Sequence, residues 1–234
     1  MVPPYFIILA QHMFSELKNI PAAWSKAWVS KSFRNQLITS VLVFITVAIY
    51  NFHFLRLWQD RPGILINDLL LNHLSPIDFS WPIFFIEYTT VWIVFIFVLP
   101  YPDRLVKGIQ AFSFVFLART ITIYLFPLEP PRDMIFLNDP LAGFFLHRPD
   151  SVVTKDLFFS GHISALATLY LVSINKNIKR WCFIATIIVA FMILCQHVHY
   201  SMDVFFAPIV SYICYKMVTY IHSQTKYGLE LQDA

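Results

Sequence analysis

The sequence predicts an all-α, polytopic membrane protein: a bundle of six transmembrane helices preceded by an N-terminal amphipathic helix. Of its 234 residues, 58% are hydrophobic and only 13% are charged, whereas soluble domains average about 45–50% apolar and about 25% charged residues. The mean hydropathy of +0.62 agrees with this and argues against a disordered chain. Six spans of about 20 residues each leave room for loops and termini but for no second soluble domain.

The chain divides into three segments. Residues 1–33 mix apolar residues with Glu16, Lys18, Lys26 and Lys31, and Trp24 and Trp28 are spaced to share one helix face. Because tryptophan prefers the membrane–water interface, we expect an amphipathic helix in that interface; a solvated helix packed on the bundle is the alternative. Residues 34–222 form the six-span domain that contains the candidate catalytic residues, and residues 223–234 form a cytoplasmic tail.

Six apolar stretches predict the six spans. Pro100 and Pro102 close the second stretch, and Pro127 closes the third. The second and fourth stretches are near the shortest length that crosses a bilayer, so we expect their ends to be embedded in protein. The predicted spans are residues 36–58, 81–99, 105–126, 157–174, 180–198 and 201–221.

The distribution of basic residues predicts the orientation of the bundle. Eleven of the 17 Lys and Arg residues lie on the side that holds both termini, and six lie on the other side. Because basic loops remain in the cytoplasm, we expect cytoplasmic termini. The loops of the opposite side then face the periplasm, a lumen or the exterior.

Composition also excludes several classes of protein. The formal net charge is only +3 and no basic run alternates with aromatic residues, which argues against a nucleic-acid partner. Cys182, Cys195 and Cys214 all lie in apolar stretches, so we interpret them as reduced packing residues. The first residues lack a basic region and a small-residue cleavage site, so we expect no cleaved signal peptide.

Polar residues gather at the membrane face opposite the termini. Arg119 lies near the end of the third span, Ser160–His162 open the fourth, and His197, His199 and Asp203 lie between the fifth and sixth. An up-and-down path through six spans brings all of them to one face. Ionisable groups in spans are costly and are therefore functional candidates.

His199 and Asp203 have the spacing of a coupled pair. Residues four apart at a helix start share one face, so the carboxylate can hold the proton of one ring nitrogen. The other nitrogen then stays basic, as in an activated nucleophile. A polar pair that only satisfies its own burial is the alternative.

The Ser160–Gly161–His162 stretch indicates an anion site. Backbone N–H groups at a helix N-terminus bind phosphate, and Gly161 permits close approach to the backbone. Ser160 either caps the helix or donates to a phosphate oxygen. His162 then lies beside the phosphate as an acid or base.

Further charged residues are candidates for meeting the charge of a phosphate. Arg119 is the first, because a buried arginine needs an anionic partner; a salt bridge with a loop carboxylate, or extension to the interface, is the alternative. Lys155 is a weaker candidate, as is Arg132. Glu129, between Pro127 and Pro130, is either a rigid turn residue or a site carboxylate.

We expect neither a metal ion nor a cofactor. His197 and His199 are two residues apart and would face opposite ways on a helix, so a shared metal would need extended backbone, and we interpret His197 as an interface histidine. The loop aspartates lack the spacing of a calcium loop; they are Asp133, Asp139, Asp150 and Asp156.

Two motifs together resemble a known family. The stretch Asp156–His162 reads DLFFSGH, and the stretch His199–Asp203, which reads HYSMD, begins 37 residues after His162. This combination resembles the type 2 phosphatidic acid phosphatase superfamily. It is most similar to the sphingomyelin synthase branch, which has Phe before Ser-Gly-His where typical lipid phosphatases have Pro. The resemblance covers about residues 60–220, including Pro76–Ser80 and Arg119.

The resemblance implies a six-span bundle with a His-His-Asp site. His199 would be the nucleophile, Asp203 its orienting partner, and His162 the acid for the leaving oxygen and then the base for the incoming hydroxyl. The implied reaction moves a phosphoryl or phospho-alcohol headgroup from a phospholipid to a lipid alcohol or water, through a phosphohistidine and without a cofactor.

The sequence departs from the phosphatase pattern in two places. The Lys-x6-Arg-Pro motif is absent, and Ile193 stands where the phosphatases have Arg six residues before the nucleophile. The long, apolar loop from Pro127 to Lys155 is expected to fold onto the site or the interface, which favours transfer over hydrolysis because it keeps water out. Two alternatives remain: a lipid phosphate phosphatase, and a non-catalytic membrane scaffold or transporter.

Overall fold

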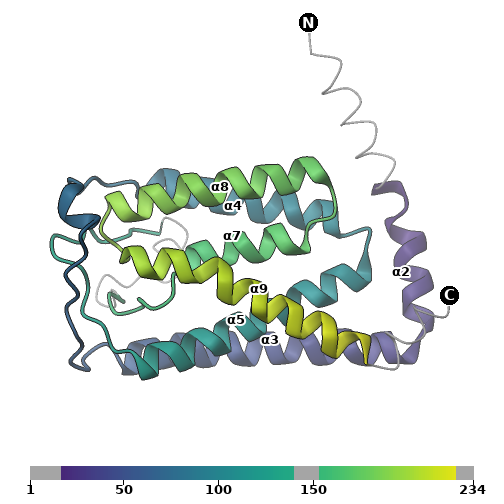
Figure 1. Cartoon of the computed structure of the whole chain (residues 1–234). Helices are drawn as coiled ribbons and strands as arrows, with labels where there is room; N and C mark the ends of the chain where they lie inside the picture. Colours follow the sequence, from purple (N-terminus) through teal and green to yellow (C-terminus); the bar gives the residue numbers. More distant parts are fainter. Residues whose placement is uncertain (1–16, 140–152, 225–234) are drawn as a thin grey trace, which may run out of the picture.

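The computed structural model describes residues 17–139 and 153–224, which are all-helical and contain no strand. Figure 1 shows the helices as one bundle with α2 across one end. The apolar residues 141–146 of the predicted loop, Asp150, residues 1–16 and most of the predicted tail lie outside the described residues. The helices are α2 (Ile20–Val29), α3 (Lys31–Leu57), α4 (Ser80–Val98), α5 (Pro102–Leu125), α7 (Gly161–Val172), α8 (Lys176–Cys195) and α9 (Ser201–Ser223), with a short 3₁₀ turn at Leu71–His73.

Five of these helices, α3, α4, α5, α8 and α9, are long and apolar enough to cross a membrane. The shortest has 19 residues, which at 1.5 Å per residue gives about 28 Å, close to the thickness of the hydrocarbon core. Their outward faces carry exposed apolar side chains such as Leu42, Phe85 and Ile187. The chain is therefore an integral membrane protein.

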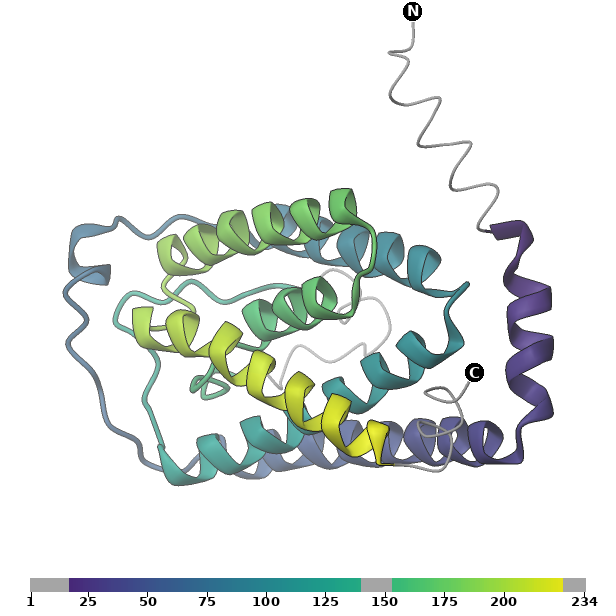
Figure 2. The ribbon, with the colours of Figure 1, turned by 45° about the vertical axis from the view of Figure 1, so that its right-hand side comes forward.

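The expected fourth span is much shorter than predicted. Helix α7 has 12 residues, or about 18 Å, and residues 153–160 approach it without helical structure. Figures 1 and 2 show α7 inside the bundle, and it packs against α4, α5, α8 and α9. A helix whose ends meet protein does not have to cross the hydrocarbon by itself. The apolar composition of residues 157–174 thus reflects burial and does not indicate a full span.

The core lies where α7 meets its neighbours. Leu166, Val115, Val189 and Ala207 belong to one buried apolar cluster, and hydrogen bonds join the helices, as is common in membranes. The Ser211 hydroxyl donates to the carbonyl of Ser164 across α9 and α7 at 3.2 Å. These contacts hold the α7 N-terminus in place.

Helix α2 runs across the end of the bundle that also holds the end of α9 (Figure 1). The indole Nε1 of Trp24 donates to the carbonyl of Leu99 at 2.8 Å, and no residue of α2 is buried. This placement fits a helix lying along the membrane surface. Its amphipathic, interfacial position stays a prediction.

Two loops cover the opposite end of the bundle. The N–H of Ile64 donates to the carbonyl of Pro127, and the N–H of Glu129 donates to the carbonyl of Ile64. A Cβ at Gly63 would lie 2.6 Å from the backbone carbon of Leu128, so the chains cross where only glycine fits. Residues 58–79 are thereby tied to residues 126–138 above the ends of the helices.

Candidate active site

The two motifs Asp156–His162 and His199–Asp203 meet at the loop-covered end of the bundle. His162 lies in the first turn of α7 and His199 in the turn between α8 and α9, and their ring centroids are 6.3 Å apart. The two histidines, 37 residues apart in sequence, therefore face the same small volume.

His199 and Asp203 form a buried pair. The Nδ1 atom of His199 lies 3.2 Å from Asp203 Oδ2, and the same oxygen accepts the N–H of Tyr200 at 3.1 Å. Helix α9 begins at Ser201, so His199 precedes the helix and the carboxylate reaches back from its first turn. A carboxylate is stabilised there by the helix dipole. The Nε2 atom of His199 is left for a substrate.

The N-terminus of α7 is capped and anchored. The hydroxyl oxygen of Ser160 accepts the N–H of Ile163, and the N–H of Ser160 donates to the carbonyl of Asp203 at 3.1 Å. Ser160 therefore ties α7 to α9 and acts as the helix cap. Within the described part of the chain, the N–H groups of Gly161 and His162 have no acceptor, as expected for a first turn open to an anion.

Arg119 lies against this N-terminus. Its guanidinium pairs with Asp156 and donates to the carbonyl of Phe159, which is the salt bridge with a loop carboxylate that the sequence left open. A Cβ at Gly161 would lie 3.0 Å from Arg119 Cζ. Glycine thus lets the guanidinium approach the backbone where a phosphate would bind, although Asp156 already compensates part of its charge.

Glu87 is a residue that sequence reasoning missed. Its Oε2 lies 3.9 Å from His162 Nε2, and its Oε1 is buried without a hydrogen-bond partner among the described residues. It is the single charged residue of α4. A lone carboxylate in an apolar span is a functional signal, and that signal could have identified it.

His162 therefore has a carboxylate of its own. Its Nδ1 is buried and has no partner in residues 17–139 and 153–224, while Nε2 faces Glu87. Each histidine thus has one nitrogen toward a carboxylate and one nitrogen available. Apo distances such as 3.9 Å commonly shorten when a substrate binds.

Lys155 and Glu129 come together, but in the loops. Lys155 Nζ donates to Glu129 Oε1 at 2.8 Å and to the carbonyl of Arg61 at 2.7 Å, and Gly63 donates its N–H to the same carboxylate at 2.7 Å. The hydrogen bond from Lys155, followed by that from Gly63, lowers the pKa of Glu129. No contact joins this pair to His162 or His199 in the described chain, so it braces the loops.

The described residues contain no group of three His, Cys, Asp or Glu side chains that could hold a metal ion. The two nitrogens of His197 lie at 3.0 and 3.2 Å from the carbonyls of Arg132 and Leu74. The ring of His197 is thus directed into the loops, whereas His199 is paired with Asp203.

One segment of the chain matches a known protein family. Residues 155–221, from Lys155 through almost all of α9, match the model of the PAP2 superfamily C-terminal domain. No curated protein matches the chain. The matched segment contains His162, His199 and Asp203. The match supports the PAP2 superfamily over this segment, which is less than half of the chain, and with it an enzyme of the lipid phosphatase or phosphotransferase type.

Proposed function

We propose that the protein is a lipid headgroup phosphotransferase similar to the sphingomyelin synthases. It moves a phosphoryl or phospho-alcohol group from a phospholipid to a lipid alcohol through a phosphohistidine on His199. The observation that supports this most is the pair of histidines whose ring centroids are 6.3 Å apart, beside the N–H groups of Gly161 and His162, free in the described chain, at the N-terminus of α7. A nucleophile, an acid–base group and an anion site are the three parts that such a reaction needs.

In the first half-reaction, Nε2 of His199 attacks the phosphorus of the donor. The N–P bond forms as the bond from phosphorus to the lipid oxygen breaks, and His162 gives its proton to that oxygen. The phosphate oxygens face the N–H groups of Gly161 and His162 and the Arg119 guanidinium. Asp203 stabilises the positive charge that develops on the His199 ring.

In the second half-reaction, the hydroxyl of the acceptor attacks the same phosphorus. His162, now unprotonated, takes the hydroxyl proton, and the N–P bond breaks to return neutral His199. Glu87 acts as a positioning residue that orients His162, as Asp203 orients His199. Catalysis then depends on positioning and electrostatic stabilisation.

The charges of the site favour a phosphodiester donor. A phosphate monoester carries about −1.5 to −2 charges at neutral pH, whereas a diester carries a single negative charge. Arg119, already paired with Asp156, supplies little excess positive charge for a dianion. A lipid phosphate phosphatase is the second candidate, because the match to the PAP2 superfamily fits it equally well.

We further propose that the termini are cytoplasmic and that the site opens on the other side. Helix α2 and the end of α9 lie at the opposite end of the bundle from the α8–α9 turn (Figure 1), in line with the charge asymmetry. Single cysteines introduced at Ser151 and Lys226 should label from opposite faces of a sealed vesicle. Labelling of both from the same face would contradict this topology.

A donor and acceptor panel tests the proposed activity. Purified protein in bilayers receives phospholipid donors with or without lipid alcohols, with a chelator present, and the products are measured by lipid mass spectrometry. We expect headgroup transfer to predominate when an acceptor is present. Rapid phosphate release from phosphatidic acid without any transfer would establish the phosphatase instead, and no turnover of any lipid would favour a non-catalytic protein.

A further inference from the structure

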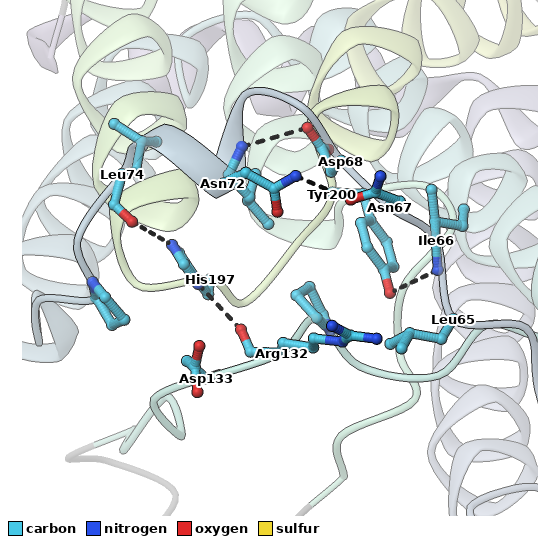
Figure 3. A pocket seen from close by; sticks show the side chains of 13 residues that line it. Leu65, Ile66, Asn67, Asp68, Asn72, Leu74, Arg132, Asp133, His197 and Tyr200 are labelled. Carbon is cyan, nitrogen blue, oxygen red and sulfur yellow. Dashed lines mark hydrogen bonds between the residues drawn. The ribbon is translucent and has the colours of Figure 1, made fainter.

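A cavity of about 590 Å³ lies outside the candidate active site, on the loop side of the α8–α9 turn. Residues 65–76 form one rim, residues 131–133 form the other, and His197 and Tyr200 lie between them (Figure 3). His162, His199 and Asp203 do not line it. Its volume is within the usual range for a small-molecule site.

The backbone is strained at this cavity. Asp133 and His197, with φ of 58° and 56°, are the non-glycine residues with left-handed backbone in the described chain, and both line the cavity. Such conformations are uncommon outside glycine and gather at functional sites.

His197 fixes the shape of the cavity. One ring nitrogen lies 3.0 Å from the carbonyl of Arg132 and the other lies 3.2 Å from the carbonyl of Leu74, so a single buried ring lies between the two rims and, when neutral, donates to one of them (Figure 3). The Tyr200 hydroxyl accepts the N–H of Ile66 and donates to the carbonyl of Glu129. The walls are thus built before any ligand binds.

Two opposite charges are left available to a ligand. The Arg132 guanidinium and the Asp133 carboxylate have no hydrogen-bond or ion-pair partner among the described residues, and Figure 3 shows both along the same rim. Asp68 also lines the cavity, but its two oxygens accept the N–H and hydroxyl of Ser201 and the N–H groups of Leu70 and Leu71. The available pair is therefore one cation and one anion.

We propose that this cavity is a second, non-catalytic binding site for a small zwitterion that carries a phosphate and an ammonium group. Arg132 binds the phosphate and Asp133 binds the ammonium. The side-chain amides of Asn67 and Asn72 are hydrogen-bonded to each other and lie on the facing rim. There they can bind the polar atoms that connect the phosphate and the ammonium group of the ligand. The ligand is either the headgroup of a zwitterionic phospholipid or the same headgroup free in solution.

Binding to the full-length protein in detergent tests the site without any turnover, so its outcome is independent of the proposed transferase. Calorimetry uses three soluble probes: glycerophosphocholine, glycerol phosphate and choline. Each is measured on the His199→Ala protein, to prevent turnover, and on the same protein with Arg132→Gln, Asp133→Asn or Asp133→Gly. Arg56→Gln is the matched control, because Arg56 lies at the same end of the bundle and does not line the cavity.

We expect glycerophosphocholine to bind more tightly than either singly charged probe. Arg132→Gln should raise its Kd at least tenfold, and Asp133→Asn should raise its Kd to that of glycerol phosphate. Asp133→Gly should do the same while the thermal midpoint stays equal or rises, since the strain is relieved.

Retention of zwitterionic phospholipid from nanodiscs, measured by native mass spectrometry and lost in Arg132→Gln, would identify the lipid as the source; binding of the soluble probe alone would identify the free headgroup. Unchanged Kd values in the Arg132 and Asp133 variants, or an equal loss in Arg56→Gln, would overturn the proposal.

Discussion

Helix α9 has a histidine–aspartate pair at each end, and the two pairs differ in what they leave open. At the end of α9, His222 Nε2 contacts Asp103 Oδ1 and Nδ1 contacts the amide of Gln36 at 2.9 Å, while Lys107 also pairs with Asp103. At its start, His199 uses one nitrogen for Asp203, and its ring faces His162. A buried histidine–aspartate pair is thus present both at a structural junction and at the candidate active site.

The difference lies in the surroundings of each pair. Both nitrogens of His222 are engaged by α3 and α5, so the ring joins three helices. His199 adjoins a helix N-terminus, an arginine and a second histidine. Removal of the His199–Asp203 pair should therefore affect chemistry, and removal of the His222–Asp103 pair should affect stability.

The largest contrast is expected between His199→Ala and His222→Ala. Loss of the nucleophile should reduce headgroup transfer by at least about 10⁴-fold, as loss of a catalytic nucleophile typically does. His222→Ala should keep transfer within severalfold and should destabilise the fold by about 1–2 kcal/mol, because Asp103 loses a buried partner. The comparison is made by measuring transfer rates and thermal midpoints of both variants. Near-normal transfer by His199→Ala would contradict the assignment of His199 as the nucleophile.

Asp203 and Asp103, the carboxylates of the two pairs, allow the same comparison. Asp203→Asn retains an oxygen for the N–H of Tyr200, so α9 should stay capped. It should lose about 10³–10⁴-fold in rate, because an amide favours the wrong imidazole tautomer. Asp103→Asn should leave the rate nearly unchanged. Rates are measured at saturating lipid, with helicity by circular dichroism as the control; equal losses in both variants would show that the pairs do not differ in function.

Glu87 and Glu129 form a comparison between the membrane core and the loops. Glu87→Gln should slow transfer by about 10²-fold, within the range of acid–base contributions, and should change the pH profile of the rate, since His162 loses a titratable neighbour. Glu129→Gln weakens the brace with Lys155 and should change the rate only severalfold. A pH profile that is identical in Glu87→Gln and wild type would reduce Glu87 to a packing residue.

Gly161→Ala tests the contact between α7 and Arg119. The added Cβ would lie 3.0 Å from Cζ of a guanidinium that Asp156 and Phe159 hold in place, so the guanidinium must shift. We expect KM for the donor to rise about tenfold, a cost of about 1.4 kcal/mol, with a smaller effect on kcat. Steady-state kinetics separate the two constants. Gly108→Ala, where the nearest atom is a valine methyl at 3.3 Å, is the control, and an equal change in it would contradict the account.

The smallest effect concerns Asp68, which ties the loop to the start of α9. Burial raises the pKa of Asp68, but hydrogen bonds from Ser201, Leu71 and Leu70 outweigh this and lower it below 3.8. Its contribution to stability is therefore present above about pH 4 and is lost as the pH falls through the folded pKa.

Thermal midpoints of wild type and Asp68→Asn should accordingly differ by a constant amount from pH 8 to pH 5, and the difference should shrink below about pH 4. Asp60→Asn, an exposed change in the same loop, should show no such difference. A gap that widens toward low pH would mean that the sign of the pKa shift is wrong.

The sequence predicted the helical membrane fold well, because apolar length alone identifies a span. It did not predict the length of α7, since residues 157–174 are apolar whether lipid or protein surrounds them. The meeting of His162 with His199 followed from the up-and-down path of the helices. The pairing of Arg119 with Asp156 could only be left open, because the position of a loop carboxylate depends on the folded loop.

Glu87 and the cavity beside His197 show two further limits of the sequence. Glu87 carried a readable signal, a charge in an apolar span, but its partner could not be known before α4 and α7 were packed. The left-handed backbone of Asp133 and His197 has no marker in the sequence, because only the folded loops impose it. Lys155 and Glu129 were separate candidates in the sequence, and the fold joins them in a brace.

Mass spectrometry of a trapped covalent intermediate tests the central claim most directly. Protein mixed briefly with a phosphodiester donor, without acceptor, is quenched in base, digested and fragmented to separate His197 from His199. The account predicts an adduct on His199 alone, with the mass of a phospho-alcohol headgroup, and none in His199→Ala. An adduct with the mass of bare phosphate, formed only from phosphatidic acid, would make the protein a phosphatase. The absence of any adduct on His199 during measurable turnover would contradict the mechanism.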